Sequence, residues 1–204
     1  MRIRSGASGL HSLGMGLVAL LALTACTGAG GGQPGAPAAE EQNRSLAPFV
    51  VTSPEVVEEA LRLAEVGKDD LVYDLGSGDG RIVIAAARRY GARGIGFELE
   101  PDLVRRAEEN ARLAGVSHLV QFRQQDVLTV DLSPATVVTV YLSPEANLML
   151  RPRMWQQLRP GARVVSYEFN MGDWLPDVFQ QVRDETGRAR ALYLWRIGPR
   201  PPGS

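Results

Sequence analysis

Residues 72–80 (VYDLGSGDG) form the feature that most restricts how this chain can fold. An apolar strand leads into a turn with three glycines, and the apolar segment 81–87 (RIVIAAA) leaves that turn as a helix. Glycine lets the backbone turn tightly and lets a ligand approach main-chain N–H groups that a side chain would shield. A strand, a glycine-rich turn and a helix in this order are typical of the nucleotide-binding corner of a doubly wound α/β domain.

The spacing of the glycines narrows the class of ligand. Gly76, Gly78 and Gly80 follow the pattern G-x-G-x-G, with Ser77 inside the turn. The dinucleotide fingerprint is G-x-G-x-x-G and would require a glycine where this chain has Arg81. We therefore expect an adenosine ligand without a pyrophosphate, and S-adenosylmethionine is the main candidate. An NAD-dependent oxidoreductase is disfavoured for the same reason.

Three acidic residues lie at or near the ends of three successive predicted strands. Asp74 lies near the end of the first, Glu98 ends the segment 94–98 (GIGFE), and Asp126 follows the third. We expect Asp74 to lie beside the cofactor's ammonium group, Glu98 to accept hydrogen bonds from ribose hydroxyls, and Asp126 to accept one from the adenine amine. Taken alone, each of these acids has a structural alternative, as a strand cap or a solvated surface group. The full set expected to bind cofactor is Thr52, Asp74, Gly76, Ser77, Gly78, Gly80, Glu98, Asp126, Val127 and Tyr141.

Strands and helices alternate along the rest of the chain, which predicts a parallel sheet with helices on both faces. Predicted strands cover 71–75, 94–98, 119–123, 136–142 and 162–169, and predicted helices cover 54–65, 80–90, 101–114 and 144–157. Two apolar runs, 178–183 and 191–197, flank a turn at Thr186 and Gly187 and predict a terminal β-hairpin. A parallel sheet that ends in an antiparallel hairpin is the pattern of class I methyltransferases.

The amino terminus carries a separate signal. Arg2 and Arg4 precede an apolar stretch from Gly9 to Leu23, which is shorter than the ~20 apolar residues that span a membrane. The sequence LTAC that ends at Cys26 resembles the lipobox of bacterial lipoproteins, and this is the only cysteine in the chain. We expect a signal peptide over residues 1–25 and lipidation of Cys26. The alternatives are a plain signal peptide or short membrane anchor with an incidental cysteine, or a start codon placed too early.

Residues 26–45 include a Gly/Pro/Ala-rich stretch that cannot bury enough apolar surface to fold, so we expect a flexible tether. The globular domain is expected to cover 46–204. A lipid-anchored domain would lie at the cell membrane or outer membrane, and in the cytoplasm if the signal is not used. The segment 48–54 precedes the first helix, and we expect Thr52 and Phe49 to form part of a lid over the cofactor.

Composition excludes several other classes of protein. The formal net charge is −1 and the basic residues are scattered, so electrostatics favour no nucleic-acid partner. His11 and His118 are the only histidines, which leaves little material for a metal site or a Ser/His/Asp triad.

Residues 46–197 resemble a class I S-adenosylmethionine-dependent methyltransferase, a Rossmann-like α/β fold. The segments 48–57, 72–80, 141–147 (YLSPEAN), 158–166 (LRPGARVVS) and 171–174 (MGDW) are similar to one family of protein lysine methyltransferases. Its mitochondrial members modify lysines in the ATP synthase c-subunit and the adenine nucleotide translocase. The chain departs from the family pattern at 167–170 (YEFN). The resemblance implies S-adenosylmethionine as the cofactor and a protein as the substrate. A membrane protein is one such substrate.

Methyl transfer to lysine needs an aligned, unprotonated amine and a site that excludes water. Tyr141 and Pro144 follow the fourth predicted strand, where the reaction is expected, and Glu168 lies at the end of the fifth. We expect Tyr141 to contact the amine through its ring or its carbonyl group, and Glu168 to bind it. A buried strand aromatic and an exposed strand-end acid are the structural alternatives for these two residues. Glu145 is expected to stabilise the helix dipole rather than to act as a base.

Two other functions remain open from the sequence. One is a methyltransferase that acts on a small molecule, and the other is a non-catalytic, nucleoside-binding envelope lipoprotein. The second gains weight from the compartment, because S-adenosylmethionine is made in the cytosol and a lipobox exports the protein. The three acids at the predicted strand ends argue for catalysis.

Overall fold

A computed structural model describes residues 51–199 of the chain. The predicted signal peptide, the tether, the lipidation site at Cys26 and the lead-in residue Phe49 lie outside the described residues.

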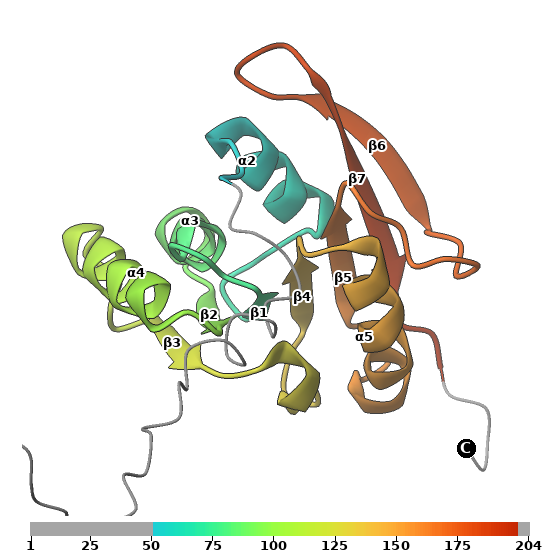
Figure 1. Ribbon diagram of the computed structural model, residues 1–204, viewed down its shortest axis with the longest axis horizontal. Helices are drawn as coiled ribbons and strands as arrows, with labels where there is room; N and C mark the ends of the chain where they lie inside the picture. The colour runs from blue at the N-terminus through green and yellow to red at the C-terminus, as the bar shows by residue number, and fades with distance from the viewer. Residues whose placement is uncertain (1–50, 200–204) are drawn as a thin grey trace, which may run out of the picture. The chain divides into compact units, whose positions relative to one another are not determined.

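A seven-stranded sheet forms the centre of the described domain, with the strand order β3-β2-β1-β4-β5-β7-β6 (Figure 1). Strands β1 to β5 pair in parallel, while β7 pairs antiparallel with both β5 and β6. This confirms the predicted parallel sheet and its antiparallel terminal hairpin. The strands are β1 (Leu71–Leu75), β2 (Arg93–Glu98), β3 (Val120–Gln124), β4 (Val137–Val140), β5 (Arg163–Tyr167), β6 (Val178–Arg183) and β7 (Ala189–Arg196).

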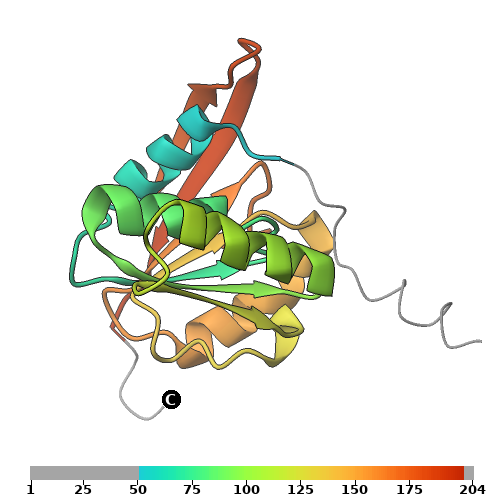
Figure 2. The ribbon, with the colours of Figure 1, turned by 90° about the vertical axis from the view of Figure 1, so that its left-hand side faces the viewer.

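Helices cover both faces of this sheet, as Figures 1 and 2 show. On one face lie α2 (Pro54–Leu63), α3 (Arg81–Tyr90) and α4 (Pro101–Leu113). On the other lie α5 (Pro144–Gln157) and the short 3₁₀ helix η1 (Val127–Thr129). Each face buries its own apolar cluster, which is the expected arrangement for strands that are apolar along their whole length. No helix within residues 51–199 is long and apolar enough to cross a membrane.

Proline begins three of the helices, and one of these three has a side-chain cap. Pro54, Pro101 and Pro144 occupy the first turns of α2, α4 and α5, where a missing N–H costs nothing. Ser143 caps α5 by accepting a hydrogen bond from the amide of Ala146. Ser53 holds the N-cap position of α2, but its buried hydroxyl makes no capping bond.

The order of the strands reverses beside β1, because β2 lies on one side of it and β4 on the other. In open α/β sheets the crevice at this point, beyond the carboxyl ends of the strands, is where ligands bind. A valine in each of β1, β4 and β5 belongs to the cluster beneath α2 and α3. Side chains alternate along a strand, so Asp74, Thr139 and Tyr167, two positions later, point to that same face.

Two predicted strands are shorter than expected. The strand predicted over 136–142 ends at Val140, and the strand predicted over 162–169 ends at Tyr167. Tyr141 and Glu168 therefore lie just beyond the ends of their strands, where the chain turns.

Candidate functional site

Asp74 is buried within β1, with 2% of its surface exposed. One carboxylate oxygen accepts a hydrogen bond of 2.7 Å from the hydroxyl of Thr139 on β4. The other oxygen, Oδ2, is buried and has no hydrogen-bond partner within residues 51–199. Burial disfavours the charged form and raises the pKa of Asp74 to about 7, against the opposing effect of the Thr139 hydroxyl. A buried, unpartnered carboxylate oxygen fits a site that receives a cationic group.

The glycine turn from Gly76 to Gly80 joins β1 to α3. Gly76, Gly78 and Gly80 all have positive φ, which side chains rarely adopt. A Cβ at Gly76 would lie 2.5 Å from the side chain of Leu142, and one at Gly80 would lie 2.5 Å from the ring of Phe122. These glycines are therefore needed for the turn itself and for close packing of neighbouring elements.

The amide groups of this turn already have hydrogen-bond acceptors within the protein. The N–H groups of Gly76 and Ser77 both donate to the carbonyl oxygen of Phe97, and that of Gly80 donates to Ser77. The N–H group of Gly78 donates to the Glu98 carboxylate at 2.8 Å. The amides of these four residues are therefore hydrogen-bonded within the protein, and cofactor binding by the turn stays a prediction. Three positions of the turn carry no side chain, and the buried hydroxyl of Ser77 has no hydrogen-bond partner within residues 51–199.

Glu98 ends β2 and lies next to the glycine turn, as the sequence predicts. Besides the bond from Gly78, its carboxylate accepts hydrogen bonds from the amides of Leu99 and Glu100 at 2.7 and 3.1 Å. These bonds fix the carboxylate at the carboxyl edge of the sheet, two strands from β4. Ribose binding by Glu98 stays a prediction.

Asp126 lies two residues beyond the end of β3 and not on the strand itself. Its carboxylate caps η1 by accepting a hydrogen bond of 2.9 Å from the amide of Leu128. Val127 follows as the buried first residue of η1. The short helix explains why an acid and an apolar residue follow each other here. Contact with an adenine ring stays a prediction for both residues.

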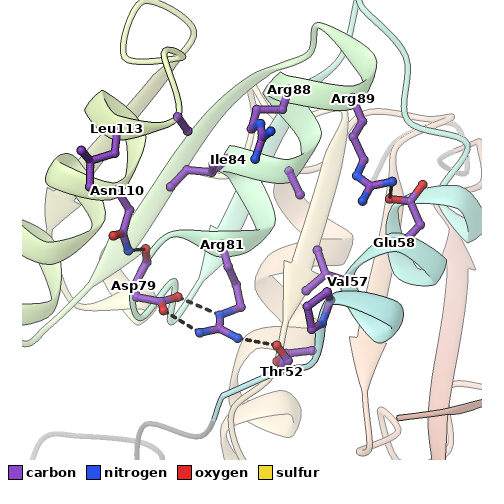
Figure 3. Close-up of a pocket in the computed structure, with 13 residues that line it drawn as sticks. Thr52, Val57, Glu58, Asp79, Arg81, Ile84, Arg88, Arg89, Asn110 and Leu113 are labelled. Atoms are coloured by element: carbon purple, nitrogen blue, oxygen red, sulfur yellow. Dashed lines mark hydrogen bonds and ion pairs between the residues drawn. The ribbon is translucent and has the colours of Figure 1, made fainter. Parts of the chain in front are cut away.

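Thr52 is buried at the entrance to α2, and its carbonyl oxygen accepts a hydrogen bond of 2.5 Å from the guanidinium of Arg81. The same guanidinium pairs with the Asp79 carboxylate through two bonds of 2.8 and 2.6 Å. Arg81 therefore ties the lead-in segment to the glycine turn, as Figure 3 shows. The residue that breaks the dinucleotide fingerprint thus has a structural role.

Thr52, Asp79 and Arg81 also border a cavity of about 710 Å³ along α2, α3 and α4 (Figure 3). Its lining comes mainly from these helices and includes Arg88, Asn110 and Leu113. Asp74, Glu98 and Tyr141 do not line it, so the cavity reaches the carboxyl edge of the sheet at Thr52 and Asp79 without including these three residues.

Aromatic rings gather beyond the ends of β4 and β5. The ring centroids of Tyr141 and Tyr167 lie 4.2 Å apart, and that of Phe169 lies 6.2 Å from Tyr141. Tyr141 is half-buried, and desolvation raises its pKa. Desolvation also raises the pKa of Tyr167, to about 12. Both phenols therefore stay protonated at neutral pH.

Glu168 follows this aromatic pair and adopts a positive φ of 65°. Its side chain is about one-quarter exposed and forms an ion pair of 3.0 Å with Arg190 on β7. It is therefore a paired, half-buried acid rather than a freely exposed one. Pro144, the other catalytic candidate, is the exposed first residue of α5 and has no group that transfers a proton.

Sequence reasoning missed Thr139, Tyr167, Asn147 and Arg190. The period of two along β4 and β5 would have placed the first two on the face of Asp74. Asn147 on α5 is fully buried, and its amide nitrogen donates to the Ser166 hydroxyl and to the Phe169 carbonyl at 3.0 and 3.1 Å. Only the tertiary structure shows that Asn147 fixes the turn after β5.

The site thus brings a buried carboxylate, a glycine cradle and a second carboxylate to the edge where the strand order reverses, with an aromatic cluster beside them. This arrangement can hold a cationic cofactor at Asp74 and present an acceptor group beside Tyr141. Within the described residues, no group of three or more His, Cys, Asp or Glu side chains is placed to hold a metal ion.

Comparison with known proteins agrees with this geometry. The family model of the ANTKMT methyltransferase domain matches residues 74–178. A protein-lysine N-methyltransferase of Saccharolobus islandicus is 40% identical over 152 residues, which are 74% of this chain and 94% of that protein. The adenine nucleotide translocase lysine N-methyltransferase of Mus musculus is 38% identical over 76% of this chain and 67% of its own length.

A crystal structure of an RNA methyltransferase from Salinibacter ruber in complex with S-adenosylhomocysteine is 52% identical, with a TM-score of 0.69. The match covers 76% of this chain and 98% of the Salinibacter chain. The family match begins at Asp74 and ends at the first residue of β6, so it takes in the carboxyl edge of the parallel strands. Together these matches show that the chain belongs to the ANTKMT methyltransferase family and is an S-adenosylmethionine-dependent methyltransferase.

Proposed function

We propose that this enzyme transfers methyl groups to the side-chain amine of lysine in a protein. The observation that carries the proposal is the group formed by Tyr141, Tyr167 and Glu168 beyond the ends of β4 and β5. Aromatic faces and a carboxylate are the groups that receive an alkylammonium ion. Support also comes from two relatives, 40% and 38% identical, which are named as protein lysine methyltransferases.

The residues of the cofactor site fit S-adenosylmethionine. Asp74 would hold its ammonium group through Oδ2, and Glu98 its ribose hydroxyls. Gly76, Ser77, Gly78 and Gly80 would provide the cradle, Asp126 and Val127 would contact the adenine, and Thr52 would belong to the lead-in segment above it. When bound, the cofactor supplies a methyl group on a sulfonium, which is an activated leaving group.

The chain's own task is to prepare the acceptor. A lysine side chain has an ordinary pKa of about 10.4, so it arrives as an ammonium ion without a lone pair. Contact with the rings of Tyr141 and Tyr167 removes water from the amine and favours its neutral form. The amine would release its proton to solvent, and its lone pair would then be free to attack the methyl group that the cofactor supplies. Glu168 would bind and orient the incoming ammonium group, and Tyr141 would place it toward the cofactor.

The test is methyl transfer from radiolabelled S-adenosylmethionine by the purified full-length protein. The acceptors are membrane and soluble extracts of a strain that lacks the gene, each divided and treated with protease or with ribonuclease. Label in a protease-sensitive band, recovered as methyllysine after hydrolysis and lost in Asp74→Ala, is the expected result. Asp69→Ala, which changes an exposed aspartate in the turn before β1, is the matched control and should keep full activity.

Methylation of RNA is the second candidate, because the 52% identical solved relative is titled an RNA methyltransferase. The near-neutral formal charge of −1 does not favour a polyanionic partner. Label that ribonuclease removes would establish this alternative. Label confined to small molecules would instead establish a small-molecule methyltransferase. Binding of S-adenosylhomocysteine without transfer to any extract would support a non-catalytic nucleoside-binding role.

We also propose the chain organisation that the amino terminus predicts. Residues 1–25 would act as a signal peptide, Cys26 would carry a lipid, residues 26–45 would form a tether, and 46–204 would form the methyltransferase domain. The basic residues, the apolar stretch and the sequence LTAC support this proposal. A lipid anchor would concentrate the enzyme near a membrane-protein substrate.

Localisation is the test of this organisation. Cells that express the full chain should incorporate radiolabelled palmitate into it and retain it in the cell membrane or outer membrane, and Cys26→Ser should abolish the label. An unlabelled protein in the cytoplasm would refute the anchor. It would also remove the problem of supplying a cytosolic cofactor to the cell envelope.

A further inference from the structure

The terminal hairpin carries an ion-pair chain that reaches the proposed acceptor site. Arg190 on β7 donates through Nη1 to the Glu168 carboxylate at 3.0 Å and through Nε to the Asp184 carboxylate at 2.7 Å. Glu168 is joined to the hairpin a second time, because its backbone amide donates to the carbonyl of Ala191 at 2.9 Å. The hairpin therefore controls both the backbone and the side chain of Glu168.

The far end of this chain is rigidly held. Asp184 lies in the hairpin turn, and its Oδ1 accepts hydrogen bonds from the hydroxyl and amide of Thr186 and from the amide of Arg188. These bonds hold the pKa of Asp184 well below its usual range, and the bond from the Thr186 hydroxyl has the largest effect. Asp184 is thus a fixed anion that holds the Nε group of Arg190 while Nη1 contacts Glu168.

Glu168 also has an unfavourable backbone conformation. Its φ of 65° lies in the left-handed region, which non-glycine residues adopt at a cost. Such conformations persist where the surrounding structure enforces them, and they concentrate at functional sites. On the other side, Asn147 fixes the carbonyl of Phe169, the next residue along the chain. The turn that carries Glu168 is therefore clamped by α5 and by β7.

We propose that Arg190 is a positioning residue that holds the Glu168 carboxylate beside Tyr141 and Tyr167 as the receiving group for a cationic acceptor. The proposal rests on the lysine acceptor proposed above. It goes beyond that function because it assigns acceptor recognition to the hairpin, away from the glycine turn and the cofactor. The acceptor's ammonium ion would meet a carboxylate whose place is set before binding, which reduces the entropy lost on binding.

The experiment measures acceptor KM and kcat separately for the full-length protein. The acceptor is a dilution series of the cell extract in which protease removes the label. The readout is the amount of radiolabelled methyllysine formed. Arg190→Gln should raise the apparent KM about tenfold and leave kcat within about twofold, as expected when a binding contact made equally in ground and transition states is lost. Arg190→Lys keeps the charge and should restore part of the affinity. Arg183→Gln, which removes another arginine of the hairpin, is the matched control and should behave like the unchanged protein.

Two further measurements separate positioning from structural damage. The affinity for S-adenosylhomocysteine should be the same in all these variants, which shows that the fold and the cofactor site are intact. Glu168→Gln should raise KM as Arg190→Gln does, and the double variant should add nothing, because one residue acts through the other. An unchanged KM in Arg190→Gln, or effects that add in the double variant, would overturn the inference. No methyllysine from the unchanged protein would instead refute the proposed function.

Discussion

At the scale of single residues, Asp74 shows how a binding site can lower the stability of the empty protein. The carboxyl is almost completely buried, and within the described residues Thr139 provides its only side-chain hydrogen bond. Burial raises its pKa from 3.8 to about 7. Between these values the unfolded chain has released a proton that the folded protein still binds. Stability therefore falls as the pH rises through this window, and the full penalty applies above about pH 7.

Replacing Asp74 by Asn should remove that penalty and damage cofactor binding at the same time. We expect Asp74→Asn to be more stable than the unchanged protein at pH 8 and equally stable near pH 4, as measured by urea unfolding at both pH values. For the unchanged protein, calorimetry should show that affinity for S-adenosylhomocysteine rises from pH 6 to pH 8 with release of a proton. A pH-independent affinity would contradict pairing of Asp74 with the ligand's ammonium group.

Gly80 and Gly187 permit a matched test of what a glycine contributes. Their φ angles are nearly equal, 81° and 80°. A Cβ at Gly80 would lie within 3 Å of Phe122 and Ala107, whereas a Cβ at Gly187 would meet nothing within 4 Å. Gly187→Ala should cost about 1 kcal/mol from the backbone alone. Gly80→Ala should cost about 2–4 kcal/mol, because overpacking is added to the same backbone term. Equal losses on urea unfolding would mean that α4 and β3 move aside freely.

At the scale of elements, the sequence predicts those helices, strands and turns whose positions are set by the residues within them. The apolar pattern and the turn residues correctly predict the strands that carry Asp74 and Glu98, the helix that starts at Pro101 and the hairpin turn at Gly187. Long-range contacts were not predictable in this way. Glu168 and Arg190 are 22 positions apart in the chain and form an ion pair only because the fold places β7 beside β5. The local sequence around either residue gives no sign of this contact.

In the described part of the lead-in segment, the carbonyl oxygen of Thr52 is held by one side chain. Arg81 donates to the Thr52 carbonyl, so Thr52→Ala would leave this contact in place while Arg81→Gln would break it. If the segment before α2 covers the cofactor, Arg81→Gln should weaken S-adenosylhomocysteine binding about tenfold. Arg88→Gln is the control, since Arg88 lies on the same helix, lines the same cavity and is exposed. Equal affinities of the two variants in calorimetry would argue against a lid.

At the scale of the whole domain, the two ends of the sheet have different tasks. The amino ends of the strands are joined by a polar network centred on Asp70, which pairs with Arg163 and accepts a hydrogen bond of 2.7 Å from the Thr136 hydroxyl. Arg163 also donates to the carbonyl oxygens of Ala64 and Glu65 after α2. These contacts join α2, β1, β4 and β5 at the end opposite to Asp74 and the glycine turn.

This separation predicts opposite effects for two aspartates that are only four positions apart. Asp70→Ala leaves the partly buried guanidinium of Arg163 without its carboxylate and should cost about 2–4 kcal/mol of stability. Affinity for S-adenosylhomocysteine should stay unchanged, because the network lies one strand length away from the carboxyl edge. Asp74→Asn should show the reverse, with stability kept or increased and affinity lost. Urea unfolding and calorimetry on both variants decide the matter. A loss of affinity in a folded Asp70→Ala protein would mean that the amino end of the sheet also shapes the cofactor site.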